Sequence, residues 1–170
     1  MKVIISNKPA RVIKAKKHLQ EKLNIKISTR GREITIDGRP EDEYIAEKVL
    51  EAIGFGFPFD VSLLIKEEDF MFEVLSIKDY TKRKDLGRIK ARIIGTKGKT
   101  LKTLADLTNC FFELKDNEIG IIGPPEYIEN AQDAVIHLIK GAKQGNVYAF
   151  LEKHQIQPIS DLGLKEKKKK

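Results

Sequence analysis

The alternation of apolar and polar residues predicts a strand at residues 70–77, and apolar repeats further along the chain predict helices. Leu86, Ile89 and Ile93 recur at helical spacing, and Gly95 is placed to end that helix in a left-handed conformation. The predicted order in this part of the chain is strand (70–77), helix (86–94), helix (99–108), strand (110–114), strand (118–122) and a helix that Pro124 and Pro125 open.

A similar pattern occurs earlier in the chain, which indicates an internal duplication. Residues 33–41 (EITIDGRPE) are echoed by residues 118–126 (EIGIIGPPE), at an offset of 85 positions. The first copy is shorter by about 15 residues just after its first strand, so it lacks one helix and the turn that would follow it. Its predicted elements are strand (2–6), helix (9–23), strand (25–29), strand (33–37) and helix (41–53).

The chain is therefore expected to be an α+β protein with two related domains, the first of them shortened. Gly54 to Pro58 interrupts regular structure between the copies, and a short helix is expected at residues 60–66. After the second copy, residues 146–154 predict one more helix. The expected domains are 1–53 (degenerate), 54–69 (linker with the short helix), 70–160 (complete, with the C-terminal helix) and 161–170 (basic tail).

Charge is distributed very unevenly along the chain, whose formal net charge is +7. Residues 82–102 hold nine lysines and arginines and one aspartate, and residues 165–170 hold five lysines and one glutamate. The rest of the chain is net acidic. Such a basic stripe on an acidic body is the electrostatic signature of a polyanion ligand. A terminal lysine run is as often a solvated tail as a binding element.

The basic stripe surrounds the motif Gly95-Thr96-Lys97-Gly98, which joins the two predicted helices of the second copy. Glycines allow backbone conformations closed to other residues and remove the Cβ atoms that would hold a ligand away. The helix that follows begins with unpaired N–H groups, which suit a phosphate. The turn is therefore a candidate phosphate-backbone site, although its glycines could also serve only as helix caps.

This arrangement, with residues 88–95 (RIKARIIG) leading into the turn, resembles the K homology (KH) RNA-binding domain of archaea and eukaryotes. More narrowly, the chain resembles the KRR and partner-of-Nob family of small-subunit ribosome assembly factors. The resemblance implies two KH-like (type I) domains, each a three-stranded antiparallel sheet packed by helices. It also implies single-stranded RNA near the 3′ end of small-subunit ribosomal RNA as the ligand, and a Nob-type endonuclease and the alpha subunit of translation initiation factor two as partners.

In such a domain the turn clamps the RNA backbone, and apolar side chains between the helices and the middle strand receive the bases. Phe111 and Phe112 point to opposite faces of their strand, so at most one of them is expected to face RNA. The candidate RNA-binding residues are Gly95, Thr96, Lys97, Gly98, Lys99, Arg92, Lys102, Arg88, Ile94 and Phe112.

The sequence gives little support for an enzymatic function. Residues 98–100 (GKT) mimic the end of a phosphate-binding P-loop, but the first glycine of that motif would fall at position 93, which is Ile93. The single cysteine, Cys110, lies in an apolar strand and is expected to be a buried residue rather than a nucleophile. We expect no enzyme, cofactor or metal site.

No apolar run reaches the roughly 18 residues of a membrane span, and the N-terminus does not resemble a signal peptide. A cytoplasmic protein without membrane partners is therefore expected. Two alternatives remain at this level. One is a protein-interaction scaffold in translation or ribosome assembly, with incidental nucleic-acid binding, and the other is a binder of single-stranded DNA, since only 2′-hydroxyl contacts would decide between the two nucleic acids.

Overall fold

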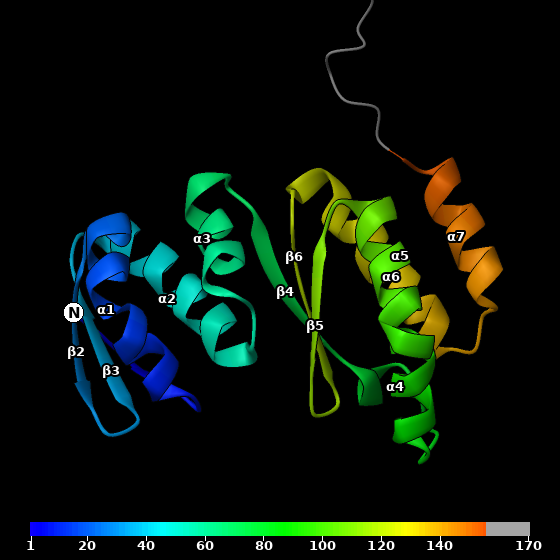
Figure 1. The fold of residues 1–170 in the computed structure, drawn as a ribbon, viewed down its shortest axis with the longest axis horizontal. Coiled ribbons are helices and arrows are strands. Elements are labelled where there is room, and N and C mark those ends of the chain that lie inside the picture. The colour runs from blue at the N-terminus through cyan, green and yellow to red at the C-terminus, as the bar shows by residue number, and fades with distance from the viewer. Residues whose placement is uncertain (156–170) are drawn as a thin grey trace, which may run out of the picture.

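A computed structural model describes residues 1–155 and contains two three-stranded antiparallel sheets, each packed by helices (Figure 1). The strand order is β1-β3-β2 in one sheet and β4-β6-β5 in the other, so the third strand of each sheet in sequence order lies in the middle. This confirms the expected fold class. The expected basic tail at 161–170, and residues 156–160 of the expected second domain, lie outside the described residues.

The first unit comprises β1 to α3 and has the element order predicted for the shortened copy, followed by one extra helix. Buried residues of α1 and α2, such as Leu19 and Val49, pack on Ile34 and Ile36 of the central strand to form its core. Asn24 ends α1 with φ 55°, a left-handed conformation that asparagine tolerates. Its elements are β1 (Lys2–Ile5), α1 (Pro9–Leu23), β2 (Lys26–Arg30), β3 (Glu33–Asp37), α2 (Pro40–Phe55) and α3 (Phe59–Glu67).

The second unit comprises β4 to α7 and has the additional helix after its first strand, as the sequence predicts. Ile89, Ile93 and Leu104 from the two helices flanking the glycine turn are buried with Ile119 and Ile121 of the central strand. Its elements are β4 (Met71–Ser76), α4 (Leu86–Ile94), α5 (Lys99–Thr108), β5 (Phe111–Lys115), β6 (Glu118–Gly123), α6 (Pro125–Ile139) and α7 (Gln144–Lys153).

The segment expected to be a linker belongs to the first unit. Helix α2 continues to Phe55, two residues past the predicted boundary at 53, and α3 packs against α2. Phe57, Leu63 and Ile65 are buried in the core of the first unit. The residues after position 53 therefore pack with the first unit, because the Gly-Phe-Gly-Phe-Pro sequence at the end of α2 also carries aromatic rings that require burial.

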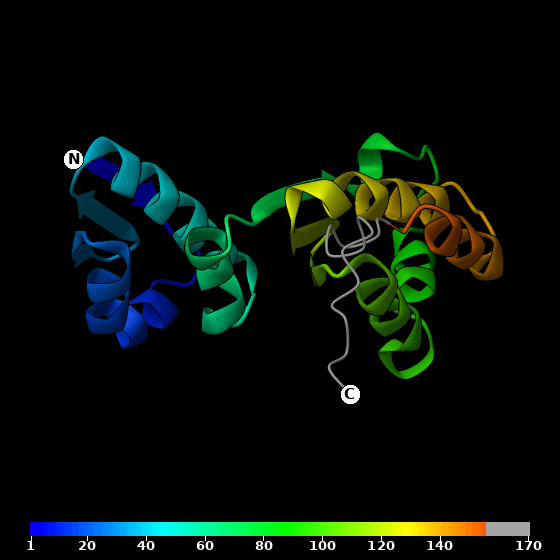
Figure 2. The same ribbon diagram turned by 90° about the horizontal axis from the view of Figure 1, so that it is seen from above.

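The two units lie side by side along the long axis of the molecule (Figure 2). Aromatic rings join them. The rings of Phe55 and Phe57 lie 6.1 Å and 5.8 Å from the ring of Phe72 in β4, and all three pack with Ile122 of β6. A Cβ atom at Gly120 would lie 2.8 Å from both Phe55 and Phe57, so the middle strand carries glycine where these rings cross it. The outer face of the second sheet is thus covered by the end of α2 and the residues after it.

No helix among residues 1–155 is long and apolar enough to cross a membrane.

Candidate nucleic-acid interface

The Gly95–Gly98 turn has a backbone shape that few sequences could adopt. Gly95, Lys97 and Gly98 have φ of 75°, 55° and 73°, so three of the four residues lie in the positive-φ region. The sequence predicts a left-handed conformation for Gly95. The observed φ is positive as predicted, but the ψ of 176° is extended rather than left-handed. The Gly98 amide donates to the Gly95 carbonyl at 3.2 Å, which closes the turn and leaves Thr96 and Lys97 exposed.

The two glycines are required for different reasons. A Cβ atom at Gly95 would lie 2.1 Å from Thr100 Oγ1 and 2.7 Å from the Thr100 amide nitrogen, so the turn is packed tightly against the start of α5. At Gly98 a Cβ atom would meet nothing within 4 Å. Since the protein itself does not fill this space, the Gly98 backbone stays open to a ligand beside the first N–H groups of α5.

Most of the predicted basic residues are exposed around the turn. Arg88, Lys97, Lys99 and Lys102 are exposed. Arg88, Lys99 and Thr96 border a cavity of about 600 Å³ between the turn and α7. These residues combine backbone N–H groups with full positive charges, which is the chemistry that binds a phosphate backbone.

Arg92 differs from the other cations because the fold uses its side chain. Its guanidinium donates to the carbonyl oxygen of Leu138, in the last turn of α6, and to that of Ala142, in the connection between α6 and α7. The Gln144 side chain donates in return to the Arg92 carbonyl at 3.2 Å and to Thr100 Oγ1 at 2.9 Å. Arg92 also borders the cavity beside Lys99, so it lies next to the turn. Its guanidinium N–H groups, however, already donate hydrogen bonds within the protein.

An apolar groove of about 280 Å³ begins at Gly98 and runs between α5 and β5. Leu101, Lys102 and Ala105 line it on the α5 side. The opposite side is formed by Phe111, Phe112 and Glu113, together with three residues that the sequence did not suggest: Phe57, Pro58 and Val61.

Of the two phenylalanines of β5, Phe111 is more exposed than the predicted RNA-binding residue Phe112. Phe112 borders the groove but is only 8% exposed, because its side chain packs in the core of the second unit. Phe111 is 39% exposed and is the ring available to a ligand. Ile94 is 37% exposed, as a surface contact requires, while its neighbour Ile93 is buried.

Glu113 brings a carboxylate to this groove. Partial burial raises the pKa of Glu113, and the nearby positive charges of Arg11 and Lys8 in the first unit act in the opposite direction. The Arg11 guanidinium itself donates to the carbonyl oxygens of Ile53 and Phe57, at 3.1 Å and 3.0 Å. Charges from both units therefore meet beside the groove.

The thiol of Cys110 lies in the core of the second unit. Cys110 is buried, and burial raises the pKa of its thiol to about 11, so the thiol is protonated and unreactive near neutral pH. Within residues 1–155 there is no group of three or more His, Cys, Asp or Glu side chains that could hold a metal ion.

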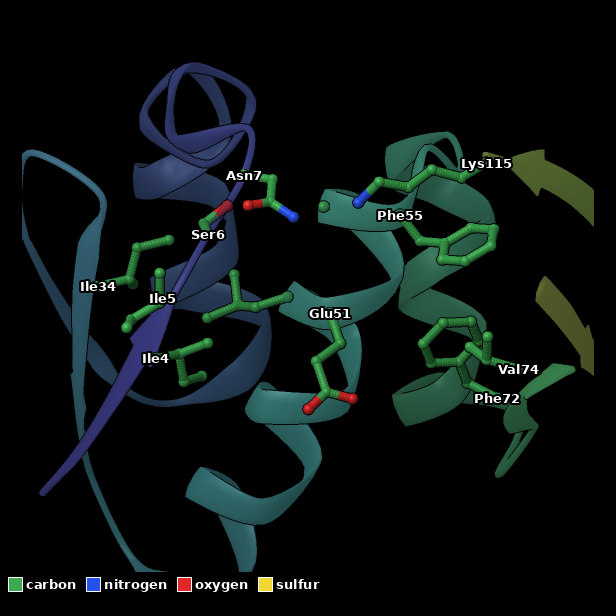
Figure 3. A pocket seen from close by; sticks show the side chains of 12 residues that line it. Ile4, Ile5, Ser6, Asn7, Ile34, Glu51, Phe55, Phe72, Val74 and Lys115 are labelled. Atoms are coloured by element: carbon green, nitrogen blue, oxygen red, sulfur yellow. The ribbon is translucent and has the colours of Figure 1, made fainter. Parts of the chain in front are cut away.

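A separate cavity of about 210 Å³ lies between β1 and α2 of the first unit and β4 of the second (Figure 3). It is lined by Ile4, Phe55 and Val74, with Glu51 and Lys115 as its charged residues. The ammonium group of Lys115 lies 5.9 Å from the centre of the Phe55 ring. None of the predicted RNA-binding residues lines this cavity, so it does not form part of the candidate interface.

Comparison with known proteins places this interface in a recognised domain. Residues 71–156, half of the chain, match the model of the second KH domain of PNO1, described as a eukaryotic-type KH domain (KH-domain type I). A KH domain-containing protein of Methanocaldococcus jannaschii is 29% identical over 147 residues, covering 82% of this chain and 65% of the relative. The pre-rRNA-processing protein PNO1 of Debaryomyces hansenii is 30% identical, covering 79% of this chain and 55% of the relative.

A solved structure has the same fold. The chain superposes with a TM-score of 0.81 and 26% identity on a chain of the a/eIF2alpha-aDim2p-rRNA complex from Pyrococcus horikoshii OT3, covering 89% of this chain and 92% of that one. The chain thus spans nearly all of the matched archaeal chain, but between about half and two thirds of the length of the curated relatives.

Proposed function

The chain belongs to the PNO1-type family of eukaryotic-type KH domains, and from that premise we propose that it binds single-stranded RNA at the Gly95–Gly98 turn and the groove beside α5. One observation carries the proposal. The open backbone of Gly98 stands at the mouth of an apolar groove and beside exposed Lys97, Lys99 and Lys102. Phosphates and bases of one strand would therefore find complementary surfaces next to each other.

The binding mechanism follows from this geometry. The turn N–H groups, the start of α5 and the lysines bind successive phosphates, which fixes the strand without reading its sequence. The groove between α5 and β5 then receives bases whose apolar faces leave water. Phe111, exposed on the strand side, offers a ring for stacking.

We further propose ribosomal RNA as the natural ligand, near the 3′ end of the small-subunit RNA. The support is that PNO1 of Debaryomyces hansenii is named as a pre-rRNA-processing protein and that the archaeal complex contains rRNA. The same complex contains a/eIF2alpha, which supports the alpha subunit of initiation factor two as a partner. A Nob-type endonuclease, as the family resemblance implies, completes the proposed set of partners, with the cytoplasm as the proposed location.

The proposal is tested by placing negative charge in the turn. The double variant T96D/K97D should lower affinity for a short single-stranded RNA at least about a hundredfold, because two carboxylates would face the phosphates. The unfolding temperature should change little, since both residues are exposed. Fluorescence anisotropy with a labelled oligoribonucleotide measures the affinity.

The matched control is I13D/K14D, which makes the same change in net charge at two adjacent exposed residues of α1. This control should lose no more than about threefold in affinity, because its carboxylates lie in the first unit and are screened beyond about 8 Å at physiological salt. Unchanged binding by T96D/K97D would refute the proposed site.

A further inference from the structure

The groove that begins at the glycine turn is closed by residues of the first unit. Phe57, Pro58 and Val61 border it together with Leu101 and Ala105 of α5 and Phe111 of β5. We propose that the segment Phe57–Val61 is a base-contacting wall, so that the first unit shapes the pocket into which the second unit places a nucleobase. This inference rests on the proposed RNA binding and names a part of the ligand site outside the KH domain that carries the turn.

The wall is held rigidly against the second unit. Phe57 is only 1% exposed, and its ring packs at 6.0 Å from that of Phe55 and at 5.8 Å from that of Phe72. Its carbonyl oxygen accepts a hydrogen bond from Arg11 at 3.0 Å. Gly120 of the middle strand leaves the room that these rings occupy. Because ordering costs are already met in the folded protein, a base can bind here without rearrangement of the wall.

The composition of the groove suits a nucleobase. Pro58 is exposed and Val61 is half-buried, and they face an α5 surface made of Leu101 and Ala105, so the walls are apolar. Lys102 and Glu113 add one donor and one acceptor group at the border of the groove. A base has two apolar faces and a polar edge, so it can place its faces against the walls and its edge toward these groups.

Continuity with the turn identifies the occupant. Gly98 belongs to the turn and also borders the groove, so a strand whose phosphate lies at Gly98 has its adjacent base at the groove entrance. The shortened copy lacks a glycine turn of its own. Its contribution to RNA binding is instead a surface that completes the site of the other unit.

The first experiment uses the absence of tryptophan from the chain. V61W places a single fluorophore on the wall, and I13W places one on the exposed surface of α1, where Ile13 is 52% exposed. Titration with a single-stranded hexaribonucleotide should quench the emission of V61W by stacking and leave that of I13W unchanged. An abasic oligomer of the same length, which offers only the ribose-phosphate backbone, should quench neither.

The second experiment measures the effect of the wall on affinity. V61Q should weaken binding of the hexaribonucleotide about three- to tenfold, because a polar side chain replaces an apolar contact surface. V61I, which keeps the wall apolar, should bind within about twofold of the unchanged chain. Both variants should keep the unfolding temperature, since Val61 is only partly buried and the buried side of α3 is formed by Ser62, Leu63 and Ile65.

The outcomes separate this inference from the function it rests on. If V61W is not quenched and V61Q binds like the unchanged chain, while T96D/K97D still abolishes binding, the wall does not contact RNA and the proposed function stands. If T96D/K97D binds normally, the turn is not the RNA clamp, and the inference fails with it. Quenching of V61W by the abasic oligomer would also overturn the inference, because the wall would then be sensing the backbone.

Discussion

Gly95 and Gly98 are the first and last residues of the same turn, yet substitution at the two positions should lower stability by different amounts. Alanine at Gly95 would place a Cβ 2.1 Å from Thr100 Oγ1, at φ 75° and ψ 176°, a region open almost only to glycine. The Cβ atom of an alanine at Gly98 would meet no atom within 4 Å, so the only cost in stability would be that of the left-handed backbone conformation.

We therefore expect G95A to lower the free energy of unfolding by about 3 kcal/mol or more, and G98A by about 1 kcal/mol. Urea denaturation followed by circular dichroism measures both values. G98A should still lose RNA affinity, because its methyl group would occupy the open space at the groove entrance. Equal stability losses in the two variants would contradict this account of the turn.

At the same scale, the sequence predicted the exposed cations better than the aromatic contacts. Lys97 and Lys99 are charged and adjoin a glycine turn, so solvation alone places them on the surface. For Phe111 and Phe112, alternation predicted that the two rings leave opposite faces of β5 but not which face is buried. That choice depends on where the helices of the second unit lie, which is tertiary information.

Helix α7 is attached to the body of the second unit through its buried apolar face and through hydrogen bonds that involve Arg92 and Gln144. The Arg92 guanidinium donates to one carbonyl oxygen at the end of α6 and to one in the α6–α7 connection. Gln144 at the start of α7 donates back to the Arg92 carbonyl and to Thr100. Val147 and Leu151 bury the apolar face of α7 beneath these bonds. Helix α4, which leads into the Gly95–Gly98 turn, is thereby connected to α7 by hydrogen bonds.

This coupling predicts that R92A lowers the free energy of unfolding by about 1–3 kcal/mol, because it removes the charge-assisted donors of two part-buried hydrogen bonds. R88A is the matched control on the same helix, since Arg88 is exposed, and it should change stability by less than about 0.5 kcal/mol. Chemical denaturation distinguishes them. The idea that Arg92 has a structural role would be wrong if both variants were equally stable.

Periodicity predicted nearly every helix and strand of the fold, because each buries one regular face. Val135 and Leu138 of α6, for example, follow the helical repeat and are fully buried. It could not predict the docking of the segment around Phe57, where an irregular backbone is fixed by contacts with Phe72, Gly120 and Arg11. Those partners are distant in sequence, and no local pattern connects them, which is also why the wall of the groove escaped prediction.

At the scale of the whole molecule, the basic segment and the apolar groove lie at the same place, beside the Gly95–Gly98 turn. Nine of the cations lie between residues 82 and 102, in the chain segment that carries α4, the turn and α5, whereas the body has a net negative charge. The first unit contributes the rings that cover the outer face of the second sheet and the far wall of the groove. We therefore expect an anionic strand to be attracted to this region, where both units contribute surfaces.

The salt dependence of binding should report on this localisation. If the turn and its flanking cations neutralise about four phosphates of a single strand, the logarithm of the association constant should fall with the logarithm of salt concentration with a slope of about −3, at roughly −0.7 per phosphate. The wall contacts bases rather than phosphates, so V61Q should weaken binding at every salt concentration and keep this slope. T96D/K97D should flatten it where residual binding can be measured, because phosphate contacts are lost. Anisotropy titrations between about 50 and 400 mM salt test both expectations, and a slope near zero for the unchanged chain would mean that the basic stripe is not the surface that RNA meets.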